Sequence, residues 1–201
     1  MSIQDDTRFT QSMQVSPQRA AETAPVHGAV MTPTAARLMA VLRIATGLVF
    51  LWAFVDKLFG LGYATSGAQA WIHGGSPTKG FLGSVDAGPF VGTLHSWAGQ
   101  PWADWLFMIG LLAIGVAVIA GAGLRLSAVT ATVMMLLMWV AEWPLARFTD
   151  AGKATQSTNP IIDYHILYAL VLIVLAAAYA GNTWGLGRRW AELVKHNRWL
   201  L

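Results

Sequence analysis

Four long apolar segments, separated by polar stretches, dominate the pattern of hydrophobic and polar positions along the chain. They lie near residues 36–59, 102–121, 124–143 and 160–180. Each holds about 20 residues, and about 20 helical residues cross a hydrocarbon layer about 30 Å thick. None alternates polar and apolar residues as barrel strands do, and four strands could not close a barrel. The pattern therefore predicts an all-α fold, a polytopic membrane protein built as a four-transmembrane-helix bundle.

Residues that start or stop helices flank these segments. Pro101 is placed to occupy the first helical position of the second segment. Asn159 and Pro160 are placed to supply the N-cap and first position of the fourth. Gly121 and Gly123 mark a tight turn between the second and third segments.

Small residues recur at four-residue spacing in the second segment, at Ala113, Ala117 and Gly121. Such a stripe lets a neighbouring helix approach closely in a membrane. We therefore expect helix packing along this face.

The polar stretches define the domain organisation. Residues 1–34 are rich in Gln, Ser, Thr and Pro without an apolar period, which predicts a disordered cytoplasmic tail. They lack the basic start and directly following apolar run of a secretory signal. The four-helix membrane domain covers 35–182, with outer loops at 60–101 and 145–159, and a basic cytoplasmic tail covers 183–201.

Lys and Arg are distributed unevenly between the two sides of this bundle. The side with both termini and the 122–126 turn holds eight, and the other side holds four: Arg8, Arg19, Arg37, Arg125, Arg188, Arg189, Lys195 and Arg198 against Lys57, Lys79, Arg147 and Lys153. The positive-inside rule therefore predicts that both termini are cytoplasmic. We expect the membrane to be the plasma membrane of a prokaryote. Arg43 lies inside the first segment, and we expect it to snorkel to the inner headgroups.

Composition narrows the class further. Hydrophobic residues make up 55% of the chain and charged residues 11%, against about 25% charged in ordinary soluble domains. The chain has no cysteine, which excludes disulfides, iron–sulfur clusters and thiol chemistry on its own residues. The apolar segments make the lipid bilayer the expected partner. The basic residues gather at the chain ends, so we expect no nucleic-acid partner.

Acidic side chains collect at the predicted outer ends of the helices. Asp56 ends the first segment, Glu142 ends the third, Asp104 begins the second and Asp163 begins the fourth, with His165 slightly deeper. A packed bundle is expected to bring these ends into one patch. We predict catalytic roles, as proton donors and acceptors, for Glu142, His165, Asp56 and Asp163. A carboxylate in a first helical turn, as at Asp163, also complements the positive helix end.

Basic and aromatic residues at the same end are candidates for substrate binding. Arg147 and Lys79 are placed to attract an anion, with His73 in the same outer loop. Trp139 and Trp143 are placed to stack on a flat ring beside the acids. The alternative for most of the ten tryptophans is the aromatic belt at the membrane surface.

The sequence carries no haem, flavin or iron–sulfur signal. A membrane haem needs paired His ligands within the spans, and only His165 lies in one. The glycine pairs lack the third glycine and strand–helix context of a dinucleotide site. A metal site from His73, His95 and His165 matches no known ligand spacing, so we predict none.

Several stretches resemble the DoxX/DoxD-like integral membrane proteins. They are RIATGLVFLWAFVDKLFGLGY, WIHGGSPTKGFL, STNPIIDYHILYALVL and GNTWGLGRRW, and the resemblance runs from about 37 to 200. It implies a four-helix membrane bundle and a redox-linked role, because namesakes include the large subunit of thiosulfate:quinone oxidoreductase. It further implies quinone as electron acceptor and a small partner subunit or peripheral redox protein. It transfers no catalytic set, so the candidate site residues rest on position alone.

Three functions remain open at this point. The first is a subunit with thiosulfate dehydrogenase (quinone)-like activity, and the second is a non-catalytic accessory or scaffold subunit of a membrane redox complex. The third is a small transporter. Transporters place polar groups near the bilayer midplane, and here the middles of the segments are apolar, so this function ranks last.

Overall fold

The computed structural model describes residues 31–155 and 157–200, which are mainly helical and contain no β-strand. Three helices are long and apolar enough to cross a membrane: α2 (Pro33–Phe59), α5 (Pro101–Ala120) and α6 (Leu124–Glu142). The all-α class is therefore confirmed, and the chain has the character of a multi-pass membrane protein. Residues 1–30 of the expected disordered tail lie outside the described residues.

The fourth apolar helix is shorter than the predicted span of 160–180. Helix α7 covers Tyr164–Ala177, and its 14 residues rise about 21 Å. The predicted N-cap was wrong: the Asn159 side chain instead accepts hydrogen bonds from the backbone N–H groups of Ile161 and Ile162, in a turn before the helix. Asp163 supplies the cap.

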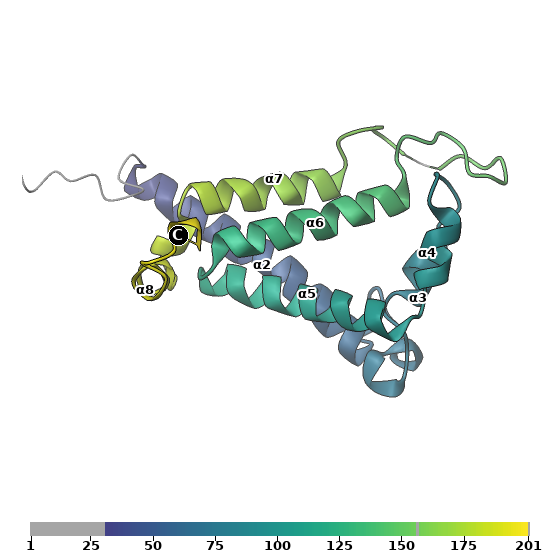
Figure 1. The fold of residues 1–201 in the computed structure, drawn as a ribbon, viewed down its shortest axis with the longest axis horizontal. Coiled ribbons are helices and arrows are strands. Elements are labelled where there is room, and N and C mark those ends of the chain that lie inside the picture. The colour runs from purple at the N-terminus through teal and green to yellow at the C-terminus, as the bar shows by residue number, and fades with distance from the viewer. Residues whose placement is uncertain (1–30, 156, 201) are drawn as a thin grey trace, which may run out of the picture. The chain divides into compact units, whose positions relative to one another are not determined.

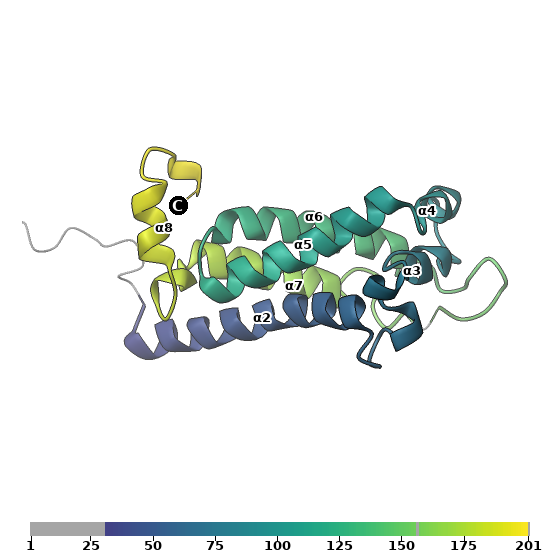
Figure 2. The ribbon, with the colours of Figure 1, turned by 90° about the horizontal axis from the view of Figure 1, so that it is seen from below.

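The long helices pack as two neighbouring pairs, α2 with α5 and α6 with α7, joined by the contact of α5 with α6 (Figures 1 and 2). Short helices occupy the two ends. One end, which we call the loop end, carries η2 (Gly67–Gln69), η3 (Trp71–His73), α3 (Lys79–Gly83) and α4 (Val91–Trp97). The other, the turn end, carries the 121–123 turn with η4 (Ala180–Asn182), α8 (Gly187–Leu193) and η5 (Arg198–Leu200).

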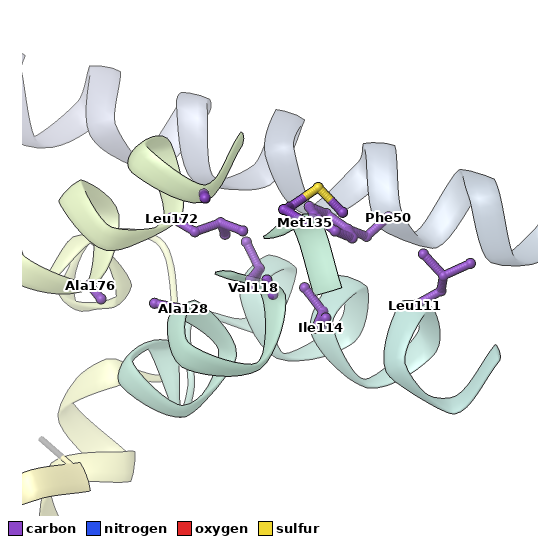
Figure 3. Close-up of a cluster of buried hydrophobic side chains, with 10 residues drawn as sticks. Phe50, Leu111, Ile114, Val118, Ala128, Met135, Leu172 and Ala176 are labelled. Carbon is purple, nitrogen blue, oxygen red and sulfur yellow. The ribbon is translucent and has the colours of Figure 1, made fainter. Parts of the chain in front are cut away.

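The shared core lies between the long helices (Figure 3). Phe50 of α2, Ile114 and Val118 of α5, Met135 of α6 and Leu172 of α7 are all buried in it. The outward faces are also apolar, since large aliphatic side chains on all four helices are half exposed or more: Leu48, Leu106, Ile109, Val133, Leu137 and Leu167. A patch of this extent is unfavourable in water, so a lipid bilayer is the environment that these helices fit.

Helices α2 and α5 approach each other through two glycines. A Cβ atom on Gly115 would lie 2.7 Å from the backbone N of Leu51, and one on Gly47 would lie 2.7 Å from a side-chain carbon of Ile119. The expected stripe was partly wrong, because Ala113 faces outward and is exposed. Close packing is present, but Gly115 rather than Ala113 provides it.

The turn between α5 and α6 follows the prediction. Gly121 ends α5 with φ 71° and Gly123 precedes α6 with φ 63°, and this left-handed conformation favours glycine. Pro101 occupies the first helical position of α5, as expected.

Arg43 does not snorkel, and this expectation was wrong. Its side chain is completely buried, and its guanidinium donates to the carbonyl oxygens of Val118 (2.6 Å), Ile119 and Trp184 (2.9 Å). The first two belong to the C-terminal end of α5, where the helix dipole favours a cation. Arg43 therefore holds the last turn of α5 and the segment after η4 together at the turn end.

Candidate functional site

Three of the predicted catalytic residues meet at the loop end. Glu142 is the last residue of α6, Asp163 directly precedes α7, and His165 lies in the first turn of α7. The Nδ1 atom of His165 is 2.8 Å from Oδ2 of Asp163 and 4.0 Å from Oε2 of Glu142. The packing of α6 along α7 brings together residues that are 21 positions apart in the sequence.

Asp163 has two structural tasks. Its Oδ1 accepts from the backbone N–H groups of His165 (3.0 Å) and Ile166 (3.2 Å), which otherwise lack partners at a helix start. Its Oδ2 faces Nδ1 of the His165 ring. The carboxylate therefore caps the helix and orients the imidazole with the same side chain, and its expected position at the positive helix end is confirmed.

His165 is the deepest member of the group. Its side chain has no exposed surface, whereas that of Glu142 is 37% exposed and that of Asp163 is 15% exposed. Nε2 of His165 is buried without a hydrogen-bond partner among the described residues. A buried polar atom without a partner costs about 1–3 kcal/mol, so a ligand that bonded Nε2 would recover that free energy.

Tyr164 also belongs to this group, and sequence reasoning missed it. Its hydroxyl donates to Oε1 of Glu142 at 2.5 Å, and its ring lies 4.0 Å from the His165 ring, measured between centroids. The available signal was its place between Asp163 and His165 at a helix start. The Tyr168 ring, one turn further along α7, packs edge-on against Phe50 and is not part of this group.

Asp56 and Asp104 instead accept hydrogen bonds from loop residues, so the prediction of a single acidic patch was wrong. Asp56 is buried and accepts from the backbone N–H groups of Tyr63 (3.3 Å) and Ala64 (3.0 Å), just after α2. Asp104 is also buried, and its Oδ1 accepts from Ser76 and Thr78. Each carboxylate therefore fixes part of the loop between α2 and α5.

The two candidate tryptophans are tied to neighbouring loops. Nε1 of Trp139 donates to the carbonyl oxygen of Ile161 at 3.0 Å, which fastens the segment before α7 to α6. The Trp143 ring packs against Gly88, where a Cβ atom would lie 2.6 Å from it, and edge-on to Phe90. The Trp139 and Trp143 rings are 6.1 Å apart.

The remaining candidates lie between the long helices, in short helices or loops of the loop end. His73 and His95 are exposed, and each ring bonds a backbone carbonyl oxygen, that of Gly67 or Val85. Lys79 is exposed beside Gly99. Arg147 lines a depression of about 500 Å³, formed together with these residues: Pro144, Leu145, Ala146, Phe148, Ala154, Thr155, Ser157 and Pro160.

Glu142, Asp163 and His165 are also the described residues that could hold a metal ion together. One potential ligand atom from each lies within 4.8 Å of the others. This set differs from the His73, His95 and His165 combination considered from the sequence, and the prediction that the chain holds no metal stays a prediction.

Comparison with known proteins identifies no relative of this chain. No protein-family model, no curated protein and no solved structure matches the chain. The resemblance to DoxX/DoxD-like proteins therefore stays an expectation from the sequence.

Proposed function

We propose that the chain is a DoxX-like, redox-linked membrane subunit of the thiosulfate:quinone oxidoreductase type. In this proposal α7 and its flanking residues form the fourth span, and the loop end faces the extracytoplasmic side of a prokaryotic plasma membrane. The observation that carries the proposal is the pairing of Asp163 with the buried His165, whose Nε2 has no partner among the described residues, at the edge of an apolar bundle.

The chemistry of the proposed reaction requires protons at this depth. Oxidation of two thiosulfate ions to tetrathionate releases two electrons and no protons. A quinone would supply the acceptor, taking up two electrons and two protons. Residues that move protons between water and the lipid-facing site are therefore needed, and a His with a carboxylate partner is the common protein solution.

Each residue of the group has a part in this proposal. Nε2 of His165 would hold a quinone oxygen and pass it a proton, while Asp163 keeps the ring in place and stabilises its charged form. Glu142 and Tyr164 lie on the exposed side, bonded to each other, and would exchange protons with water. Glu142 is 4.0 Å from Nδ1, so a water molecule or a small side-chain movement has to bridge these two groups. Nδ1 gives up its own proton to Asp163 when it takes one from Glu142's side, and Nε2 regains the proton it lost when the imidazole changes tautomer.

The substrate anion would reach the same end. Arg147 is exposed and lines the depression between the residues after α6 and those before α7. A cation there raises the local concentration of an anion such as thiosulfate.

The experiment uses the full chain in lipid nanodiscs, with any subunits that co-purify. Reduction of a soluble quinone analogue by thiosulfate is measured for the wild type, His165→Leu, Glu142→Gln and, as control, His196→Gln, an exposed change at the turn end. We expect His165→Leu to lower the rate and the quinone affinity at least tenfold, and His196→Gln to leave both unchanged. Equal rates in His165→Leu and the wild type, or no reduction with or without partners, would contradict the proposal.

A scaffold subunit is the second candidate, and one observation favours it. The loop end exposes large side chains that a partner protein could cover: Tyr63, Ile72, Phe90 and Phe148. If His165→Leu and Glu142→Gln leave the cellular phenotype intact while Ile72→Ser/Phe90→Ser at the loop end abolishes it, the scaffold explanation is the correct one.

A further inference from the structure

The last described segment of the chain, residues 184–200, is strongly basic. We call it the C-terminal basic segment. It contains four cationic residues, Arg188, Arg189, Lys195 and Arg198, against one acid, Glu192. Within the described part of the chain, Arg188, Arg189 and Lys195 form no ion pair. Their charge is therefore available to an external partner.

The bundle holds this segment firmly at the turn end. The Leu186 backbone N–H donates to the carbonyl oxygen of Ala120 at 2.8 Å, and Arg43 donates to that of Trp184 at 2.9 Å. Further along, Nε1 of Trp190 donates to the carbonyl oxygen of Leu200 at 2.8 Å, which folds the segment back on itself. The segment begins directly at the last residue of α5, where the lipid-facing surface of the bundle ends.

Helix α8 runs across the direction of the long helices in Figure 2, and Figure 1 shows it nearly end-on. If the long helices cross a bilayer, α8 lies along its surface. Apolar side chains of the segment stand exposed beside the cations: Leu193 is 78% exposed, Trp184 62% and Trp199 57%. Basic residues mixed with Trp and Leu in this orientation are typical of helices that lie in the headgroup layer.

We infer that the C-terminal basic segment binds anionic phospholipid headgroups of the leaflet at the turn end. Charge complementarity selects the anionic lipid, and continuity with the lipid-facing helices selects a membrane rather than a soluble partner. A basic residue near an anionic membrane surface strengthens binding about fivefold. The inference is independent of the proposed redox function, because it involves neither His165 nor the loop end.

The test measures lipid affinity of the full chain in detergent by native mass spectrometry, with phosphatidylglycerol and phosphatidylcholine as probes. The variant is R188Q/R189Q/K195Q, and the matched control K79Q/R147Q/K153Q removes the same charge at the loop end. We expect the wild type to prefer phosphatidylglycerol, the variant to lose more than tenfold of that affinity, and the control to change less than twofold. Equal affinity for both lipids, or equal losses in both variants, would overturn the inference.

A second measurement locates the lipid. The chain has no cysteine, so Leu193→Cys, with Ser96→Cys as control, can carry a single fluorophore in nanodiscs. Doxyl-labelled phosphatidylglycerol should quench the label at position 193 more strongly than doxyl-labelled phosphatidylcholine does, and should show no such preference at position 96. Absence of the preference at 193 would contradict the inference, as would binding of an acidic protein there in place of lipid.

Discussion

At the scale of single residues, Asp163 combines a cap with a charge, and two substitutions separate these roles. Asp163→Ala removes the N-cap and the partner of His165, and cap loss alone costs about 0.5–2 kcal/mol. Asp163→Asn keeps a good cap but loses the carboxylate. We expect Asp163→Ala to lower the thermal midpoint clearly, Asp163→Asn to lower it little, and both to lose quinone reduction. Intrinsic tryptophan fluorescence during heating measures the midpoint, and equal destabilisation by both variants would contradict this division.

His165 itself should contribute little to stability. His165→Leu loses one hydrogen bond, worth about 0.5–1.5 kcal/mol, but it also removes the unpartnered buried Nε2, which costs about 1–3 kcal/mol. We therefore expect a free energy of unfolding within about 1 kcal/mol of the wild type, in the same heating experiment. A much larger loss would show that Nε2 has a structural partner, and that the site does not keep it available for a ligand.

The grouping of the site residues could be predicted only in part from the sequence. Glu142, Asp163 and His165 were predicted to gather, because each lies at the same end of a predicted helix, and they do. Asp56 also lies at this end of a predicted helix, but it does not join the group. Its carboxylate instead accepts hydrogen bonds from two backbone N–H groups of the loop that follows α2. Such loop geometry has no counterpart in helix periodicity, so position alone could not separate the two cases.

At the scale of elements, Arg43 fastens the end of α5 to the C-terminal basic segment. Hydrogen bonds to charged groups are worth about 1.5–3 kcal/mol each, and Arg43 supplies several. We expect Arg43→Met to speed hydrogen exchange at the amides of residues 184–186 at least tenfold, and Arg37→Met, an exposed change on the same helix, to leave it unaltered. Unchanged exchange in Arg43→Met would contradict this role.

The contact of α2 with α5 gives a second prediction at this scale. Gly115→Ala places a Cβ atom against the backbone of Leu51, which cannot move without shifting α2, whereas Gly92→Ala in α4 meets nothing within 4 Å. Overpacking costs about 1–3 kcal/mol, so we expect a lower thermal midpoint for Gly115→Ala and no loss for Gly92→Ala. Equal midpoints for the two variants would show that α2 and α5 do not pack this closely.

Most helix ends could be predicted from the sequence, but which side of each helix packs against another helix could not. Pro101, Gly121 and Gly123 fixed helix ends that the structure confirms. The inward and outward faces of the helices are both apolar, because lipid tails and the protein core favour the same side chains. The sequence therefore could not show that Gly115 packs while Ala113 faces outward, nor that Arg43 would find the carbonyl oxygens of another helix.

At the scale of the whole molecule, the two ends of the bundle have to lie on opposite sides of a membrane for the proposed function. Apolar faces on α2, α5, α6 and α7 indicate lipid around the bundle. The cluster of Glu142, Asp163 and His165 lies at the loop end, and the C-terminal basic segment lies at the turn end. The proposed function requires the first to face outward and the second to face the cytoplasm.

The most direct test is labelling of single cysteines in intact cells with a membrane-impermeant thiol reagent. Ser96→Cys reports on the loop end and His196→Cys on the turn end, and both positions are exposed. We expect position 96 to react in intact cells, and position 196 to react only after the membrane is opened. The reverse pattern, or reaction of both positions in intact cells, would contradict an outward-facing Glu142–His165 site on a membrane-spanning bundle.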